Sequence, residues 1–261
     1  MLRIMTIGDV TSPVAATALA GKLWEIRRTH RIDFLAVNPE NAGFIIGPSA
    51  DTARTLLDKG ADLLTGGNHT LQNQSLHALL ENDNRVIRPA NLPAAAPGVG
   101  YTILSANGYR ILAVNALGRV EMEPVSDSPF ATIEKILERE AGNYDLSILD
   151  FHAEASGEKV ALAMYFDGRF AAVYGTHTHV PTADLSILPR GTGYVSDVGM
   201  CGASGGVLGI SLESVLKLHL TGVPTRYTVA EGDLFADAVI FTVDPSQNKC
   251  TALERVRLSL Q

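Results

Sequence analysis

The chain has 261 residues, of which 46% are hydrophobic and 19% charged, and a formal net charge of −7 at pH 7. It is long enough for a sizeable core, and its acidity argues against stable nucleic-acid binding through phosphate contacts. No apolar run approaches the ~20 residues that cross a bilayer, the N-terminus lacks a secretion signal, and Cys201 and Cys250 form no disulfide framework. We therefore expect a cytoplasmic protein.

Apolar runs of strand length alternate with amphipathic helical patterns along the chain. Strands are predicted at residues 2–9, 33–38, 61–69, 100–106, 109–117, 144–153, 169–177, 191–199, 226–233, 237–244 and 252–260. Helices are predicted at residues 16–28, 50–59, 74–82, 129–142, 157–166 and 212–220. The alternation indicates an α/β layered fold, and the hairpin through Asn107-Gly108 indicates mixed rather than purely parallel sheets. Because no linker or repeat interrupts the pattern, we expect a single domain over residues 1–261.

Polar clusters follow the apolar strands at the point where each strand ends. They are Asp9, Asn38-Pro39-Glu40-Asn41, Gly66-Gly67-Asn68-His69, the segment DFHAEA that holds His152, and GTHTH, which holds His177 and His179. Ligands of open α/β sheets bind beyond the carboxyl ends of the strands, so these side chains are expected to share one site. Gly8, Gly66, Gly67 and Gly175 would let the backbone turn sharply beside it.

The pair His177 and His179 carries little information by itself. In an extended chain alternate residues point the same way, so both imidazoles would face one side, where neutral rings could share a metal ion. Two hydrogen-bonding loop histidines are the alternative. Asp9 could likewise cap the following helix and Asn68 could be a turn residue. Taken together, however, five strand ends that supply carboxylate, amide and imidazole groups indicate a site for one or two divalent metals.

The motifs GD, PEN, GNH, DFHAEA and GTHTH, in that order and spacing, resemble the calcineurin-like metallophosphoesterase superfamily and, within it, the bacterial YmdB-like phosphodiesterase branch. The resemblance implies a four-layered α/β sandwich, in which two mixed β-sheets are flanked by helices, with a dinuclear metal centre. It departs from the wider superfamily at Thr11, where a histidine is usual, at Glu40, where the bridging carboxylate is usually Asp, and at Thr70, where an acidic residue is usual.

Position by position, the resemblance implies two overlapping ligand sets. One ion would be held by Asp9, Glu40, Asn41 and His179, and the other by Glu40, Asn68, His152 and His177. Glu40 would bridge the two ions, and His69 would be the catalytic histidine rather than a ligand. The metals are expected to be Fe or Mn, with Zn compatible with the same donors.

The implied activity is hydrolysis of phosphodiesters, in particular cyclic nucleotides, by a metal-bridging hydroxide with His69 as general acid. The residues themselves do not select diester over monoester, so a phosphomonoesterase or nucleotidase on the same centre is the first alternative. A nucleotide- or RNA-binding regulator with little turnover is the second. The expected partner is a small phosphodiester or nucleotide, without a membrane, and a homo-oligomer would be usual for such an enzyme.

Overall fold

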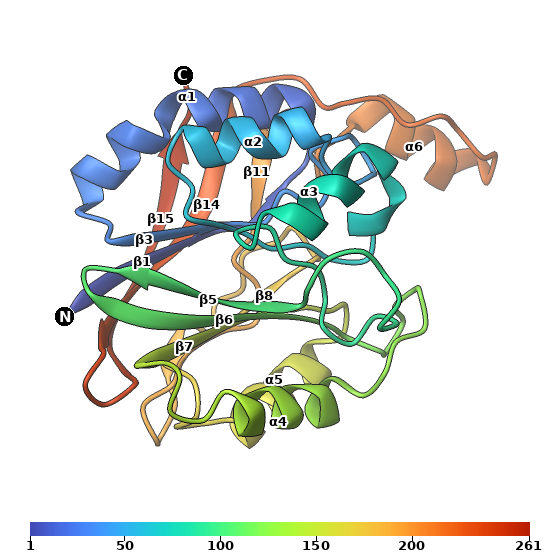
Figure 1. Ribbon diagram of the computed structural model, residues 1–261. Coiled ribbons are helices and arrows are strands. Elements are labelled where there is room, and N and C mark those ends of the chain that lie inside the picture. Colours follow the sequence, from blue (N-terminus) through green and yellow to red (C-terminus); the bar gives the residue numbers. More distant parts are fainter.

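The computed structural model describes residues 1–261 as two β-sheets packed face to face between helices (Figure 1). The first sheet has the order β2-β11-β14-β1-β3-β4, with β15 paired to β14. Its strands are β1 (Leu2–Ile7), β2 (Asp9–Val10), β3 (Phe34–Val37), β4 (Leu63–Leu64), β11 (Met200–Ala203), β14 (Leu234–Asp244) and β15 (Lys249–Ser259). β3 runs parallel to β1 and β14 runs antiparallel to it, so the sheet is mixed, as predicted.

The second sheet has the order β5-β6-β7-β8-β10-β9 and is also mixed. Its strands are β5 (Tyr101–Ala106), β6 (Tyr109–Leu117), β7 (Leu146–His152), β8 (Ala172–Thr176), β9 (Ser186–Ile187) and β10 (Gly193–Val195). The predicted hairpin forms between β5 and β6, and Asn107 and Gly108 both have positive φ at its tip. That pair of left-handed residues matches the right-handed twist of the two strands.

Helices cover the outer face of each sheet, which gives the predicted four layers (Figure 1). The helices are α1 (Pro13–His30), α2 (Ala50–Asp58), α3 (His77–Asn82), α4 (Pro129–Arg139), α5 (Ser156–Tyr165) and α6 (Leu212–Thr221). Ser12 caps α1, with its hydroxyl accepting from Ala15 N, and Pro13 occupies the first helical turn. α1, α2 and α3 lie on the first sheet and α4 and α5 on the second.

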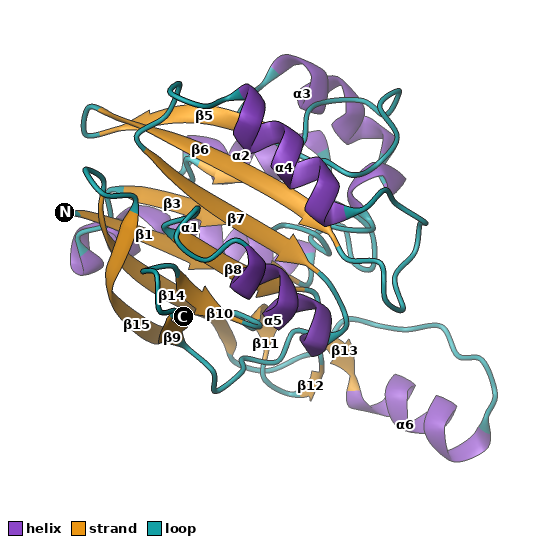
Figure 2. Cartoon of the chain, turned by 90° about the horizontal axis from the view of Figure 1, so that it is seen from below, coloured by secondary structure: helices purple, strands orange, loops and turns teal.

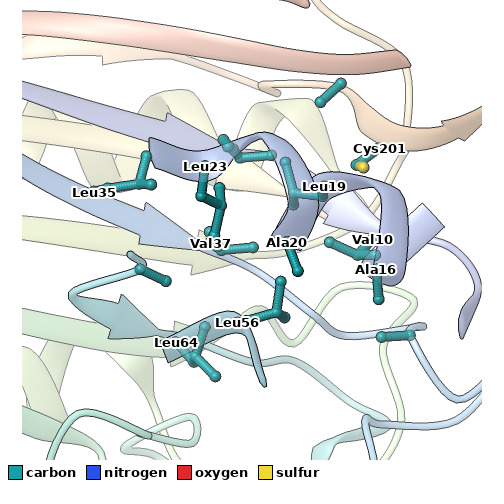
Figure 3. Close-up of a cluster of buried hydrophobic side chains, with 14 of the residues drawn as sticks. Val10, Ala16, Leu19, Ala20, Leu23, Leu35, Val37, Leu56, Leu64 and Cys201 are labelled. Carbon is teal, nitrogen blue, oxygen red and sulfur yellow. The ribbon is translucent and has the colours of Figure 1, made fainter. Parts of the chain in front are cut away.

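Three apolar clusters separate the four layers. Along β1 the side chains alternate: Met5 and Ile7 pack toward the helices, whereas Leu2 and Ile4 pack between the sheets. Figure 3 shows the helix-side cluster, where Leu19 and Leu23 of α1 meet Val37 of β3. Burial on both faces explains why these strands read as continuous apolar runs in the sequence.

Several details differ from the sequence-based expectation, and among them the strand predicted at 191–199 is shortened to β10 (Gly193–Val195). The predicted strand at residues 226–233 is wrong, because this segment forms only an isolated bridge, between Val229 and Ile210. The strand predicted at 61–69 is reduced to Leu63–Leu64, since hydrogen bonding to β3 ends at Thr65, whose N–H donates to the Val37 carbonyl at 3.1 Å. Conversely, the Gly-rich stretch around Cys201 forms β11, where no strand was predicted, and the Cys201 side chain is fully buried against α1.

α6 is set apart from the two sheets and extends from the molecule beyond the short hairpin of β12 (Gly206–Val207) and β13 (Ile210–Ser211) (Figure 2). Of its residues only Ser214 is buried. None of the helices has the length and apolar character that spanning a membrane requires.

Candidate metal centre

The strand-end side chains selected from the sequence meet at one place in the structure. A cavity of about 330 Å³ is lined by Asn41, Asn68, His69, His177 and His179 together with eight other residues. Asp9, Glu40 and His152 are at most 1% exposed and contact this group from behind. All eight predicted site residues therefore belong to one connected cluster at the carboxyl ends of the strands.

Three imidazole rings in the cluster each direct one ring nitrogen toward an acceptor outside the cluster. His152 Nδ1 donates to Thr176 Oγ1 at 2.9 Å, and His179 Nδ1 donates to the Leu208 carbonyl at 3.0 Å. His177 Nε2 lies 3.1 Å from a carboxylate oxygen of Glu154. Each ring thus gives its N–H to an acceptor outside the cluster, which leaves the other nitrogen as an acceptor facing inward.

The inward-facing nitrogens lie against other acceptor atoms. His152 Nε2 is 3.1 Å from His177 Nδ1 and 3.1 Å from Asn68 Oδ1. His179 Nε2 is 3.1 Å from Asn41 Oδ1. Burial lowers the pKa of His177 to about 4 and holds the pKa of His152 and His179 below the usual range, so the rings are neutral at pH 7. Lone pairs that converge in this way call for a shared cation.

His177 and His179 line the same cavity, but not because alternate residues of an extended strand point the same way. Both have positive φ, 101° and 63°, so the segment is a left-handed turn rather than an extended strand. The turn is held by backbone hydrogen bonds, because His177 N donates to Asp9 Oδ2 at 2.9 Å and Thr178 N donates to Asp197 Oδ2 at 3.0 Å. The two imidazoles still reach the same cavity, but from a strained backbone that the surrounding carboxylates stabilise.

Asp9 and Glu40 are the two buried carboxylates of the cluster. Glu40 accepts hydrogen bonds from the backbone N–H groups of Gly67 and His69 and from Thr70 Oγ1, the last at 3.0 Å. Thr70, which departs from the superfamily pattern, therefore supports Glu40. Asp9 Oδ1 has no hydrogen-bond partner although it is buried, and it lies 3.6 Å from His152 Nδ1.

Burial, together with neighbouring carboxylates, makes the cluster electrostatically unfavourable by itself. Burial and the charge of Asp197 raise the pKa of Asp9 to about 8, and burial and the charge of Asp9 raise the pKa of Glu40 to about 8. Burial raises the pKa of Asp150 to about 7. Against these four buried carboxyl groups stands one buried ammonium group, Lys159. Burial therefore disfavours ionisation of these carboxyl groups at pH 7, and bound divalent cations would supply the positive charge that their ionised forms lack.

The donor set also fits them in chemical type. The His, Asp and Glu side chains do not by themselves form a group of three around one ion position. The amide oxygens of Asn41 and Asn68, each 3.1 Å from an inward-facing imidazole nitrogen, belong to the same donor set. A mixture of carboxylate, amide and neutral imidazole without thiolate suits Fe, Mn and Zn.

Sequence reasoning missed the residues that support these donors. Asp150 accepts from Thr176 Oγ1 at 2.7 Å, and this hydroxyl in turn accepts from His152. Lys159 donates to the Thr176 carbonyl and to Asp197 Oδ2, both at 2.9 Å, directly below the turn that carries the two histidines. A signal for Asp150 was available, because residues two apart on a strand point to the same face, as Asp150 and His152 do.

Gly67 was expected to allow a sharp turn, but it serves instead to leave space for the His152 ring. A Cβ atom on Gly67 would lie 2.2 Å from His152 Nε2, so any larger residue would displace that ring. Gly67 does not have positive φ. The glycine is therefore required for space next to an inward-facing donor atom.

His69 lies beside the donors and contacts one of them. Its Nδ1 accepts from Asn41 Nδ2 at 2.9 Å, so the ring hydrogen is on Nε2. Burial and the neighbouring His179 hold the pKa of His69 below its usual range. His69 is thus a half-buried, neutral ring on the cavity wall with a hydrogen available for donation.

Comparisons with known proteins identify the family of the chain and its fold. The family described as YmdB-like protein matches residues 5–256. A 2',3'-cyclic-nucleotide 2'-phosphodiesterase of Bacillus subtilis is 37% identical, over 99% of this chain and 97% of its own length. The crystal structure of a novel phosphatase of Mycoplasma pneumoniae superimposes with a TM-score of 0.90 at 31% identity, over 99% of this chain and 93% of that one. A calcineurin-like phosphoesterase of Bacillus subtilis shares the fold, with a TM-score of 0.60 at 14% identity, over 99% and 90%.

Proposed function

The chain belongs to the YmdB-like protein family, and we propose that it is a dinuclear metal-dependent phosphodiesterase that acts on cyclic nucleotides. Relatives that match nearly its whole length are named phosphodiesterase and phosphatase, and the chain is a hydrolase of phosphoesters. The observation that supports the metal-dependent mechanism is that His152, His177 and His179 each direct an acceptor nitrogen into the cluster. Asp9 Oδ1, which is buried without a hydrogen-bond partner, belongs to the same cluster.

We assign the donors to two ions according to their contacts. His179 and Asn41 touch each other and form one group, and His152, His177 and Asn68 form the other. Asp9 contacts His152 and His177, so its contacts do not assign it to the first set. We assign Asp9 to the first set, and Glu40 as the bridge between both, from the family resemblance. Two such ions, when bound, lower the pKa of water and neutralise charge on phosphoryl oxygens.

The remaining residues orient donors or move a proton. Thr176 and Glu154 take the outer N–H groups of His152 and His177 and so keep the inner nitrogens free to bind. His69 is placed to give its Nε2 proton to the leaving oxygen. A phosphodiester anion bound beside the ring favours its charged form, so His69 would gain the proton that it donates as substrate binds.

The cavity favours a diester over a monoester. None of its lining residues is Lys or Arg, and Glu154 contributes the one carboxylate. A phosphodiester carries one negative charge, whereas a monoester at neutral pH carries nearly two. Since no cationic side chain is present to offset the second charge, the metal ions alone would have to bind it.

Turnover of simple esters tests this proposal. With added Mn²⁺ we expect the chain to hydrolyse bis-p-nitrophenyl phosphate with a higher kcat/KM than p-nitrophenyl phosphate, and a chelator should abolish both activities. Faster turnover of the monoester would assign the site to a phosphomonoesterase instead. Nucleotide binding without turnover of either ester would leave a regulatory binding protein.

A further inference from the structure

The cavity above the candidate metal centre has an apolar side that the proposed chemistry does not use. We call it the apolar rim, and it consists of Phe44, Ile45, Leu208 and Ile210. Ile45 is 37% exposed and Leu208 43% exposed, although both face a polar cluster. Apolar side chains that gather at the mouth of a polar site commonly bind a ligand.

The apolar rim is attached to one half of the donor cluster. Phe44 N donates to the Asn41 carbonyl at 2.8 Å, and the Leu208 carbonyl accepts from His179 Nδ1 at 3.0 Å. Asn41 and His179 in turn contact each other at 3.1 Å. Asn41 also contacts His69. A ligand bound on the apolar rim is therefore held at a fixed distance from Asn41, His179 and His69.

The backbone of the rim is strained. Phe44, Ile45 and Leu208 have φ values of 63°, 64° and 54°, a left-handed conformation that bulky side chains rarely adopt. Strain of this kind persists where the surrounding structure enforces it, and it is concentrated at ligand-binding sites. Two separate loops thus place strained apolar side chains at the same cavity.

The charge and size of the cavity restrict the occupant of the rim. Because the lining contains no Lys or Arg and Glu154 is engaged by His177, the group on the rim should be uncharged. The volume of about 330 Å³ lies at the lower end of the range of roughly 300–1,000 Å³ typical of small-molecule sites. A single nucleoside is of suitable size, and further phosphate groups would meet no cationic side chain.

We propose that the apolar rim binds the nucleobase of the substrate by stacking on Phe44, with Leu208 and Ile210 enclosing the base, while the ribose phosphate reaches the metal centre. This inference rests on the proposed function and specifies how that site recognises its substrate. Stacking on an aromatic ring depends on the face of a base and not on its hydrogen-bonding edge. The enzyme therefore accepts all four bases, and it disfavours nucleotides that carry an additional phosphate.

Cyclic phosphates that differ only in the group at the position of the base distinguish base recognition from hydrolysis of the phosphodiester. The substrates are 2',3'-cyclic AMP, 2',3'-cyclic UMP, and the 2',3'-cyclic phosphates of methyl riboside and octyl riboside, which replace the base by a small or an aliphatic group. We expect kcat/KM for cyclic AMP to exceed that for the methyl riboside by about 5- to 160-fold, the range of one stacked base. Cyclic UMP should lie within about tenfold of cyclic AMP, since neither base is read by its edge.

Three variants test whether the apolar rim causes the preference for a substrate that carries a base. Phe44→Ala should remove most of the preference for the base over the methyl riboside, and Phe44→Tyr should retain it. Ile46→Ala, a control at an exposed neighbour that does not line the cavity, should not change this ratio. Adenosine, which has no phosphate, should bind the wild-type chain in calorimetry more tightly than it binds Phe44→Ala, with or without metal.

The outcomes distinguish this inference from the proposed function. Equal kcat/KM for cyclic AMP and the methyl riboside, a preference for the octyl riboside, or an equal loss on every substrate in Phe44→Ala would overturn base stacking. In each of these cases phosphodiester hydrolysis itself would stand. Absence of turnover on all four substrates, with adenosine binding weakened in Phe44→Ala, would contradict the proposed function and support the stacking site.

Discussion

His69→Ala is expected to lower kcat by about 10²–10⁴-fold, the contribution typical of a positioned general acid, while both metal ions remain bound. The reason is geometric: His69 Nδ1 is engaged by Asn41 Nδ2, so the ring presents Nε2 and its N–H at the cavity, and Nδ1 is not free to bind a metal ion. The loss should be smaller for an ester with a good leaving group such as p-nitrophenolate, because that oxygen needs little protonation.

The measurements are steady-state kinetics on two diesters of different leaving-group pKa, together with the metal content of the variant. His219→Ala, on the exposed part of α6, is the matched control and should not affect either quantity. Loss of a metal ion in His69→Ala would mean that His69 is a ligand. Equal losses for good and poor leaving groups would contradict proton donation.

Glu40→Gln is expected to weaken both metal sites together. Glu40 is at most 1% exposed, lies 3.8 Å from His152 Nε2 and interacts electrostatically with Asp9, two residues that we assign to different ions. Removal of its charge should reduce metal affinity by more than the roughly 10–100-fold that loss of an outer partner of a ligand costs. His179→Ala should weaken chiefly one ion, because His179 contacts only the Asn41 side of the cluster.

Titration of metal-free protein with Mn²⁺, followed by calorimetry, measures the two affinities in each variant. Because Glu40 also accepts from the Gly67 and His69 backbone N–H groups, a thermal melt must establish that Glu40→Gln is folded at the temperature used. If both variants lose one ion each, Glu40 is a terminal ligand and the bridging assignment is wrong.

Most of the fold could be predicted from the sequence because its two core sheets are covered on both faces. Burial on both faces makes β1, β3 and β7 continuous apolar runs, and Pro13 and Ser12 mark the start of α1. The family and the four-layered fold inferred from the ordered motifs are confirmed. The segment 226–233 was mistaken for a strand because its β-branched and aromatic residues form an extended loop that makes only one bridge.

The site was predictable to the extent that it depends on strand ends. Asp9 and Glu40 follow the parallel strands β1 and β3 of the first sheet, so they had to be near each other. His152 ends β7 of the second sheet, and only the face-to-face packing of the two sheets brings it to the same place. The convergence of His177 and His179 was correct for the wrong reason, since a left-handed turn and not an extended strand produces it. Phe44 and Leu208 could not be found in this way, because their positions depend on loop conformations that no residue periodicity encodes.

The metal content of the purified chain tests the central claim most directly. Elemental analysis of protein isolated without chelators should give close to two first-row transition metal ions per chain, and Mn²⁺ or Fe²⁺ should restore activity to metal-stripped protein. One ion per chain at full activity would contradict the dinuclear centre. Protein that contains no such metal and is not activated by Mn²⁺ or Fe²⁺ would contradict the metal-dependent mechanism as a whole.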